Sequence, residues 1–137
     1  MYHYRKTWKR YLRARNTDGC PFCRAQTLKD AISETKLSYV VPNTVKYDLW
    51  EGHDVEDHLL IVPKRHVLSL NDLNKEEKLD IMGIAAKYEV RGYSVYARGK
   101  AFSKRSVAHQ HTHLIKANNQ KPKWLFFIAK PRLLIKR

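Results

Sequence analysis

Several short segments of the chain predict strands, some as apolar runs and others by alternation of apolar and polar positions. Residues 37–41 and 58–62 are compact apolar runs, each stopped by a proline, as is typical of strands in a sheet. Residues 93–98 and 107–115 alternate between apolar and polar side chains, and residues 124–129 predict a last strand. The links between these segments are short, which favours antiparallel pairing.

Two other segments show helical spacing. Asn74 followed by Glu77 resembles a capping box, and the helix predicted from there runs to Gly92. Its apolar positions are Leu79, Met82, Ala86 and Val90. Residues 3–15 predict a second, amphipathic helix, with a basic face and an apolar face of Tyr4, Trp8, Tyr11 and Leu12. The pattern predicts an α+β fold, with a mainly antiparallel sheet of about five strands, one long helix and one or two short ones.

The length of the chain allows one folded domain. It has 137 residues, of which 43% are hydrophobic, which is enough for a real core. No apolar run approaches the roughly 18 residues that a membrane-spanning helix needs. The first 15 residues are charged throughout, unlike a secretory signal. We therefore expect a cytoplasmic protein without a transmembrane segment.

The basic residues are concentrated at the two ends. Lys and Arg number 27 and Asp and Glu 13, for a net charge of +14, yet every acidic residue lies between Asp18 and Glu89. The chain thus divides into a basic amphipathic arm at residues 1–15, a nearly neutral body at residues 16–117 and a basic extension at residues 118–137. This distribution indicates an electrostatic function added to the chemistry of the body.

Three alternate histidines, His109, His111 and His113, are the most informative feature of the body. In a strand, alternate side chains share one face and lie roughly 7 Å apart, so the three imidazoles would form a row able to hold one anion. Such a row suits metal binding or phosphate chemistry, because a neutral imidazole can attack phosphorus and cationic neighbours stabilise the phosphoryl oxygens. The central His111 is the natural nucleophile. The alternative is a polar strand face with solvated histidines.

A Cys-x-x-Cys pair, Cys20 and Cys23, offers a second site. In a reducing compartment such a pair more often binds a metal or exchanges thiols than forms a structural disulfide. His66 and His109 follow at equal intervals of 43 residues, and the four side chains satisfy a tetrahedral Zn²⁺ site. Four protein ligands leave no open position, so the ion would be structural. A thioredoxin-like redox pair and two free thiols are the alternatives.

Three segments resemble a known family. The run His109-Gln110-His111-Thr112-His113-Leu114-Ile115 resembles the His-φ-His-φ-His-φ-φ signature, with φ apolar, of the histidine triad superfamily of nucleotide hydrolases and transferases. Residues 58–66 resemble that family's strand ending in Pro-Lys-x-His, and residues 20–23 the Cys-x-x-Cys of many bacterial members. The resemblance covers roughly residues 18–117, and three segments matching in order are more specific than any one alone. It implies a single histidine triad domain.

The resemblance also implies a two-step reaction on a nucleoside phosphate. His111 attacks the α-phosphorus to give a nucleotidyl-histidine, and water or another acceptor then takes the nucleotidyl group, as in phosphoramidases and dinucleoside polyphosphate hydrolases. His113 and Ser106 match the family's phosphate and leaving-group contacts. In zinc-containing members the first triad histidine, here His109, is a metal ligand, which implies the four ligands named above.

The substrate contacts depart from the family's pattern. Gln110 and Thr112 are polar where φ is usual. Relatives usually have an Asn and a Gly-Gln pair in the loop before the triad, where this chain has several basic residues. A charge there would replace an amide, supplied by Arg98, Lys104 or Arg105.

The nucleoside contacts follow from the same resemblance. Relatives usually hold the ribose with an Asp, for which Asp48 is the nearest match and Glu51 or Asp54 are alternatives. Asn43 and Tyr47 would line the base pocket.

Two other functions fit the charge pattern. Residues 1–15 and 116–137 together carry 13 basic residues, and aromatic residues are interleaved with them, which suits a nucleic-acid-binding module. An enzyme that removes an adenylate from a nucleic-acid 5′ end would combine the arms with the triad. RNA or DNA is the expected partner of the arms, with an anionic membrane surface as the alternative. Triad relatives are commonly dimers, so a homodimer is also expected.

Overall fold

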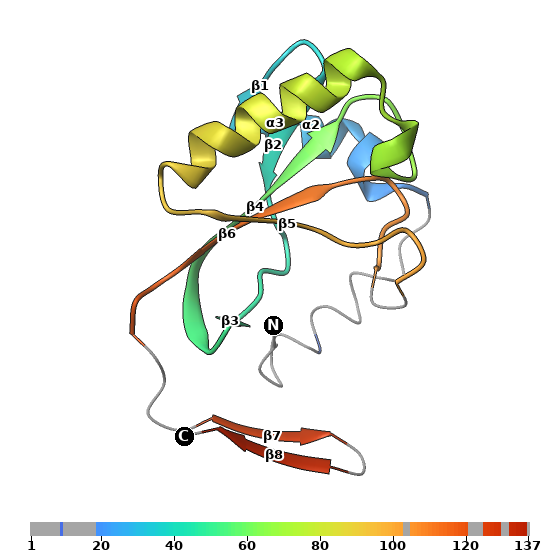
Figure 1. Ribbon diagram of the computed structural model, residues 1–137. Helices are drawn as coiled ribbons and strands as arrows, with labels where there is room; N and C mark the ends of the chain where they lie inside the picture. The colour runs from blue at the N-terminus through green and yellow to red at the C-terminus, as the bar shows by residue number, and fades with distance from the viewer. Residues whose placement is uncertain (1–8, 10–18, 103–104, 121–124, 130–131, 137) are drawn as a thin grey trace.

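The computed structural model describes residue 9 and residues 19–102, 105–120, 125–129 and 132–136 (Figure 1). One antiparallel sheet has the order β1-β2-β4-β6-β5, and β3 pairs with the start of β4. The strands are β1 (Ser33–Glu34), β2 (Ser38–Pro42), β3 (Leu49–Trp50), β4 (His53–Pro63), β5 (Ser94–Ala97) and β6 (Thr112–Ala117). Two further strands, β7 (Leu125–Ala129) and β8 (Arg132–Lys136), pair with one another. The predicted α+β fold with a mainly antiparallel sheet is confirmed.

The described helices lie before the sheet and between β4 and β5. They are η1 (Pro21–Cys23), α2 (Ala25–Lys29), η2 (Leu70–Asp72) and α3 (Lys75–Glu89). The predicted capping box starts α3: the side chain of Asn74 accepts from the N–H of Glu77, and the Glu77 carboxylate accepts from the N–H of Asn74. Two N–H groups at the start of the helix are thereby satisfied. Within the described part of the chain, no helix is both long and apolar enough to cross a bilayer.

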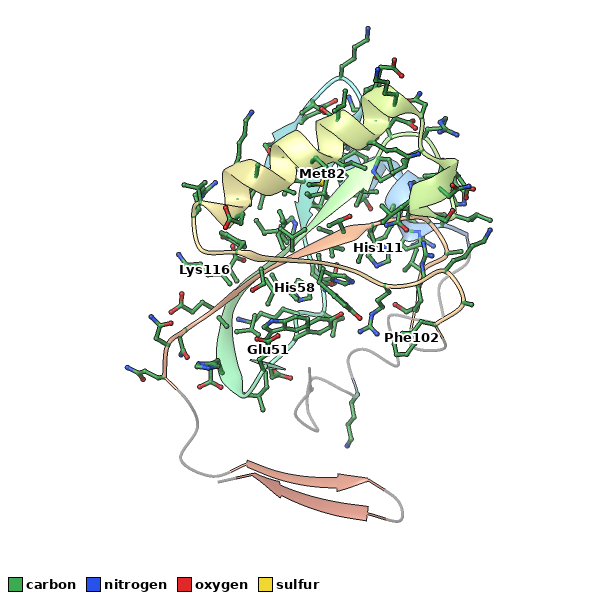
Figure 2. The ribbon with its side chains drawn as sticks, in the orientation of Figure 1. Glu51, His58, Met82, Phe102, His111 and Lys116 are labelled. Carbon is green, nitrogen blue, oxygen red and sulfur yellow. The ribbon has the colours of Figure 1, made fainter. Side chains whose placement is uncertain are left out.

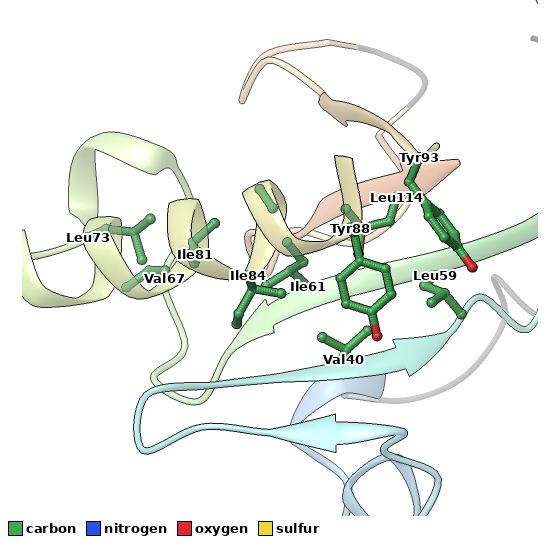
Figure 3. Close-up of a cluster of buried hydrophobic side chains, with 11 residues drawn as sticks. Val40, Leu59, Ile61, Val67, Leu73, Ile81, Ile84, Tyr88, Tyr93 and Leu114 are labelled. Carbon is green, nitrogen blue, oxygen red and sulfur yellow. The ribbon is translucent and has the colours of Figure 1, made fainter. Parts of the chain in front are cut away.

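The long helix α3 packs on the sheet through a different face from the one that revealed it in the sequence. Leu79, Met82 and Val90 are 64%, 65% and 84% exposed. The buried cluster between α3 and the sheet contains instead Ile81, Ile84, Ala85 and Tyr88 of the helix with Val40, Leu59, Ile61 and Leu114 of the strands (Figure 3). Both sets have helical spacing, so the periodicity located the helix without identifying its buried face.

Strand β4 is covered on both faces. Leu59 and Ile61 pack in the cluster with α3, whereas Leu60 and Val62 pack with Tyr39, Val41 and the partly buried Phe22. His58 shares the face of Leu60 because alternate residues of a strand point the same way. His113 lies directly opposite Leu60 on β6, so it points to that face too. Both histidines therefore lie on the side of the sheet away from α3.

Two strands begin well away from their predicted starts, and one strand was not predicted at all. β4 begins at His53 because β3 folds back on it through a tight turn, in which Glu51 and Gly52 have φ of 51° and 83°. β6 begins at Thr112 instead of residue 107. The residues before Thr112 pair instead with the loop after β4, where the N–H of Gln110 donates to the carbonyl of Val67. The predicted strand at residues 124–129 is β7, and its partner β8 was not predicted.

The predicted N-terminal helix lies outside the described residues except for Lys9. The division into an arm, a body and an extension stays a prediction.

Candidate active site and metal centre

Four side chains from distant parts of the sequence meet in one cluster, namely Cys20, Cys23, His66 and His109. Their ligand atoms all lie within 4.8 Å of one another. Nδ1 of His109 is 3.4 Å from Sγ of Cys20 and 3.5 Å from Sγ of Cys23. Nδ1 of His66 is 3.3 Å from Sγ of Cys23. The ligand set predicted from the sequence is close enough to bind one metal ion.

The geometry and chemistry of this cluster fit a tetrahedral metal ion. An ion about 2.0 Å from nitrogen and 2.3 Å from sulfur holds its ligand atoms roughly 3.3 to 3.8 Å apart, which matches the three nitrogen–sulfur distances just given. Nε2 of His109 donates to the carbonyl of Pro63 at 3.0 Å. Metal-bound histidines commonly make such a second contact, and here it leaves Nδ1 facing the sulfurs.

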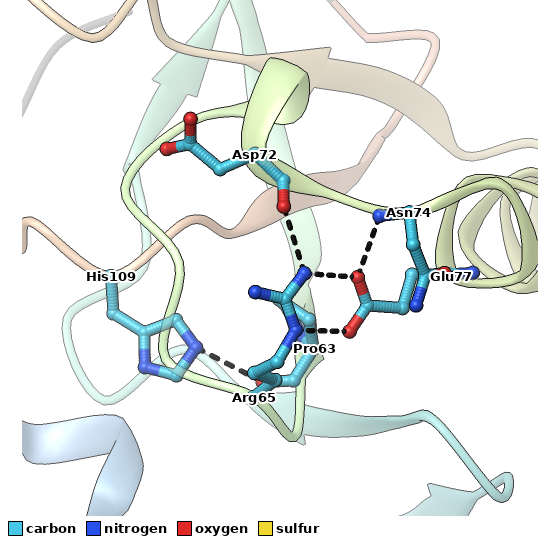
Figure 4. Close-up of polar contacts among 6 residues, drawn as sticks. All are labelled: Pro63, Arg65, Asp72, Asn74, Glu77 and His109. Atoms are coloured by element: carbon cyan, nitrogen blue, oxygen red, sulfur yellow. Dashed lines mark hydrogen bonds and ion pairs between the residues drawn. The ribbon is translucent and has the colours of Figure 1, made fainter.

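The loop that carries His66 is fixed to the start of α3. Nε and Nη2 of Arg65 donate to the carboxylate of Glu77 at 2.9 and 2.6 Å, and Nη2 also donates to the carbonyl of Asp72 at 2.8 Å (Figure 4). The hydrogen bond from Arg65 lowers the pKa of Glu77, which keeps the carboxylate charged at neutral pH. Glu77 thus caps α3 and at the same time holds the loop that carries His66.

His111 is held in one tautomer by the main chain. Its Nδ1 lies 2.8 Å from the carbonyl oxygen of His109, and because a carbonyl only accepts, Nδ1 carries the proton. Nε2 of His111 therefore keeps its lone pair. The ring is 7% exposed and packs edge to face against Phe22 at 5.1 Å and His113 at 5.0 Å between centroids. Burial lowers the pKa of His111 to about 4, so the ring is neutral at pH 7.

His58 and His113 form a hydrogen-bonded pair beside His111. The main-chain N–H of Tyr47 donates to Nδ1 of His58 at 3.1 Å, so the proton of His58 lies on Nε2. Nε2 of His58 then donates to Nδ1 of His113 at 2.9 Å. The proton of His113 is consequently on Nε2, a buried atom with no hydrogen-bond partner among the described residues. Burial, followed by the charges of His111 and His58, lowers the pKa of His113 to about 2.

The chain of hydrogen bonds from Tyr47 through His58 to His113 is called the relay below. It includes His58, to which the sequence alone assigned no catalytic role. His58 opens an apolar strand, and from the sequence alone it reads as a capping or pocket-lining residue. Its alternation with Leu60, combined with the pairing of β4 and β6, would have placed it on the face of His113. Figure 2 shows His58 and His111 on the side of the sheet away from α3.

Aromatic rings and Arg98 surround this pair. The ring of Tyr47 lies 4.3 Å from His58 and 5.5 Å from His113 between centroids, and Trp50 stacks on Tyr47 at 6.1 Å. Arg98 is 9% exposed, and its Nη2 donates to the hydroxyl of Tyr47 at 2.9 Å. Its guanidinium also lies 5.5 to 5.9 Å from the rings of Tyr47, Tyr96 and Phe102.

A second arginine approaches from the segment before β6. Arg105 donates to the carbonyls of Val107 and Ala108 at 3.2 and 2.7 Å and to Oε1 of Gln110 at 3.2 Å. The charges of both Arg105 and Arg98 act to lower the pKa of His111, after the larger effect of burial. Two guanidinium groups therefore lie within electrostatic reach of one neutral imidazole.

The other predicted substrate contacts occupy different surroundings. Asn43 lies against His58, with its Nδ2 3.3 Å from Nδ1 of that ring. Asp48 is half-buried just before β3, and Ser106 is exposed in the segment that leads to His109.

The predicted single row of three histidines is wrong in one respect. Because β6 starts only at Thr112, His109 precedes the strand and its ring faces the cysteines. The rings of His111 and His113 remain adjacent. The three histidines therefore do not form one row: His109 belongs to the metal-type cluster (Cys20, Cys23, His66 and His109), His113 is bonded to His58, and His111 packs beside His113.

Solved structures of histidine triad proteins have the same fold as this antiparallel sheet with its one long helix. A HIT family hydrolase from Clostridium thermocellum superposes with a TM-score of 0.57 at 18% identity, covering 79% of this chain and 98% of its own. A histidine triad nucleotide-binding protein from Candida albicans gives 0.57 at 22% identity, covering 81% and 84%. Plasmodium falciparum diadenosine triphosphate hydrolase in complex with Cyclomarin A gives 0.53 at 22% identity, covering 68% and 64%.

These similarities show that the chain has the histidine triad fold. They confirm the fold that the resemblance of the motifs implied. No protein-family model matches the sequence, and no curated protein matches it.

Proposed function

We propose that this protein is a histidine triad nucleotide hydrolase or transferase, in which His111 attacks the α-phosphorus of a nucleoside phosphate. The observation that carries this proposal is the hydrogen bond from Nδ1 of His111 to the carbonyl of His109, since it leaves a neutral imidazole with a lone pair on Nε2. Hydrolases named among the structures with this fold support it.

The reaction proceeds in two displacements. The lone pair of His111 Nε2 forms a bond to the α-phosphorus, and the bond from that phosphorus to the leaving group breaks with its electron pair. A water oxygen then attacks the α-phosphorus, the P–N bond returns its electron pair to Nε2, and the proton of the water passes to solvent. The Nε2–H of His113, a buried donor without a partner among the described residues, would donate to a phosphoryl or leaving-group oxygen.

The remaining predicted contacts complete the site. Ser106 would reach the leaving group, Asp48 the ribose and Asn43 the base, as the resemblance implies. Cys20, Cys23, His66 and His109 would hold a structural Zn²⁺, which would tie the turn at residues 20–23 to the loop after β4.

The neutral state of His113 and the charges of Arg98 and Arg105 favour dinucleoside polyphosphates over phosphoramidates as substrates. A neutral His113 donates a hydrogen bond but is a poor source of the proton that an amine leaving group needs. A phosphate leaving group departs as an anion, which the guanidinium groups of Arg98 and Arg105 would stabilise.

Mass spectrometry of the full-length protein tests the covalent step. The protein is incubated with a dinucleoside polyphosphate or a nucleoside phosphoramidate, quenched in alkali and digested, and a nucleotidyl adduct is expected on His111. His111→Ala should give no adduct and no turnover, whereas His53→Ala, a histidine outside both clusters, should behave as wild type. Turnover without any adduct on His111, or retained turnover in His111→Ala, would refute the mechanism.

A further inference from the structure

The metal-type cluster and the nucleophile share one residue. His109 uses its ring for the cluster, through Nδ1 facing the cysteines and Nε2 donating to Pro63. It uses its main-chain carbonyl for His111, by accepting the proton on Nδ1. A rotation of the His109 backbone would therefore turn away the acceptor that fixes the tautomer of the nucleophile.

The main chain around that carbonyl is held from the same loop. The N–H of Gln110, the residue after His109, donates to the carbonyl of Val67 at 2.7 Å. Val67 directly follows the ligand His66, and Pro63, which accepts from the His109 ring, lies at the other end of this loop. The direction of the His109 carbonyl consequently depends on the loop between Pro63 and Val67.

The Cys-x-x-Cys turn makes a second, direct contact with the nucleophile. Phe22 lies between the two cysteines, and its ring packs against His111 at 5.1 Å and against His109 at 5.9 Å between centroids, at interplanar angles of 61° and 77°. Edge-to-face contacts of this kind favour one orientation of the two rings. The hydroxyl of Tyr39, a buried residue of β2, donates to the carbonyl of Phe22 and ties the turn to the sheet.

We infer that Phe22 and the carbonyl of His109 make the metal-type cluster a positioning device for His111, so that a metal ion bound there orients the nucleophile without touching substrate. Phe22 sets the plane of the His111 ring that brings Nδ1 to the carbonyl of His109, and that hydrogen bond sets the tautomer. The inference rests on the proposed function for its kinetic consequence, but the orientation of His111 exists without substrate.

The test measures that orientation in the full-length protein before any turnover. Long-range ¹H–¹⁵N spectra distinguish a protonated from a bare ring nitrogen, and the His111 signals are assigned by their absence in His111→Ala. We expect zinc-loaded wild type to show one His111 tautomer, protonated at Nδ1. Withdrawal of the metal by a chelator, and Phe22→Ala with its metal still bound, should each populate the second tautomer.

Kinetics with a dinucleoside polyphosphate give the second readout. Phe22→Ala should lower kcat roughly 10- to 100-fold, the range typical of residues that orient a functional ligand, with KM changed by less than about threefold. Phe22→Tyr keeps the ring and should restore most of kcat, whereas Leu28→Ala, a truncation of an exposed side chain on α2, should leave kcat and the spectra unchanged.

The outcomes separate this inference from the proposed function. If metal-free wild type and Phe22→Ala both keep the wild-type tautomer of His111, the positioning role is excluded. If Phe22→Ala loses its metal, Phe22→Leu at saturating zinc replaces it, and an unchanged tautomer there excludes the role of Phe22. Absence of turnover and adduct in wild type would instead contradict the proposed function and leave the spectroscopic result standing.

Discussion

Nε2 of His58 lies 2.9 Å from Nδ1 of His113, and this contact joins two buried histidines from neighbouring strands into one relay. The relay begins at the main-chain N–H of Tyr47, which cannot change its donor role. The orientation of every proton along it is therefore set by the backbone, and His113 presents an N–H donor while remaining neutral.

The first prediction concerns His58 as a positioning residue. His58→Ala removes the donor to Nδ1 of His113, so the proton of His113 is no longer confined to Nε2. We expect kcat to fall roughly 10- to 100-fold with little change in KM, as for other residues that fix a histidine tautomer. Steady-state kinetics and the ring ¹⁵N shifts of His113 measure the two effects.

His58→Gln is the matched variant, because its amide N–H can still donate to His113. It should recover part of kcat. Equal losses in both variants, with unchanged His113 shifts, would show that His58 only fills space.

The second prediction concerns metal content. Purified protein should contain one zinc ion per chain, and Cys20→Ser or His66→Ala should each lose it. Because binding free energy at a structural site is folding free energy, the variants should melt roughly 10 °C or more below wild type. Elemental analysis and thermal denaturation provide the measurements, and His53→Ala serves as the control. A folded wild type without metal, equal in stability to Cys20→Ser, would contradict the prediction.

The third prediction concerns Arg98. Arg98→Met keeps the length and apolar contacts of the side chain but removes the charge next to Tyr47 and Tyr96. In the proposed reaction Arg98 stabilises the phosphate leaving group, and a hydrogen bond to a charged group contributes about 1.5–3 kcal/mol. Its loss should therefore lower kcat/KM for a dinucleoside triphosphate roughly 10- to 100-fold. The loss for a phosphoramidate with a neutral amine product should be smaller.

Arg91→Met is the control for this substitution, since Arg91 is exposed and stacks on Tyr88 away from the site. Equal losses for the two substrates in Arg98→Met would mean that Arg98 contacts only the α-phosphate, which both substrates share.

Local patterns in the sequence were sufficient for the helix, most of the strands and the metal-type cluster. Asn74 and Glu77 mark the start of α3 because a capping box depends only on residues three apart. Cys20, Cys23, His66 and His109 were recognisable because few residue types bind zinc, and the fold brings all four together.

Features that depend on tertiary contacts were missed. β6 starts late because Gln110 pairs with Val67 of a distant loop instead of a neighbouring strand, which periodicity along one segment does not reveal. The roles of His58 and Phe22 depend on which strands are neighbours and on how the Cys-x-x-Cys turn packs. The buried face of α3 was predicted wrongly for the same reason. The exposed set that contains Leu79 and the buried set that contains Ile81 both have helical spacing.

The last prediction concerns acid stability. His113 has a pKa of about 2 in the folded protein and His111 about 4, against about 6.5 for an exposed histidine, and burial is the main cause for both. Below pH 6.5 the unfolded chain binds protons that the folded chain excludes. The stability associated with neutral rings is therefore complete above pH 6.5 and is lost as the pH falls toward 4, by about 1.4 kcal/mol per pH unit for each ring.

Urea unfolding at several pH values between 7.5 and 4.5, in the presence of excess zinc, measures this loss. His113→Gln removes one of the two titrating rings, so the slope of unfolding free energy against pH should decrease by about one proton relative to wild type. The difference between the two proteins isolates His113, because protonation of the metal ligands contributes to both curves alike. Identical slopes would mean that His113 is already protonated in the folded protein near pH 6, and its role as a neutral donor would then have to be abandoned.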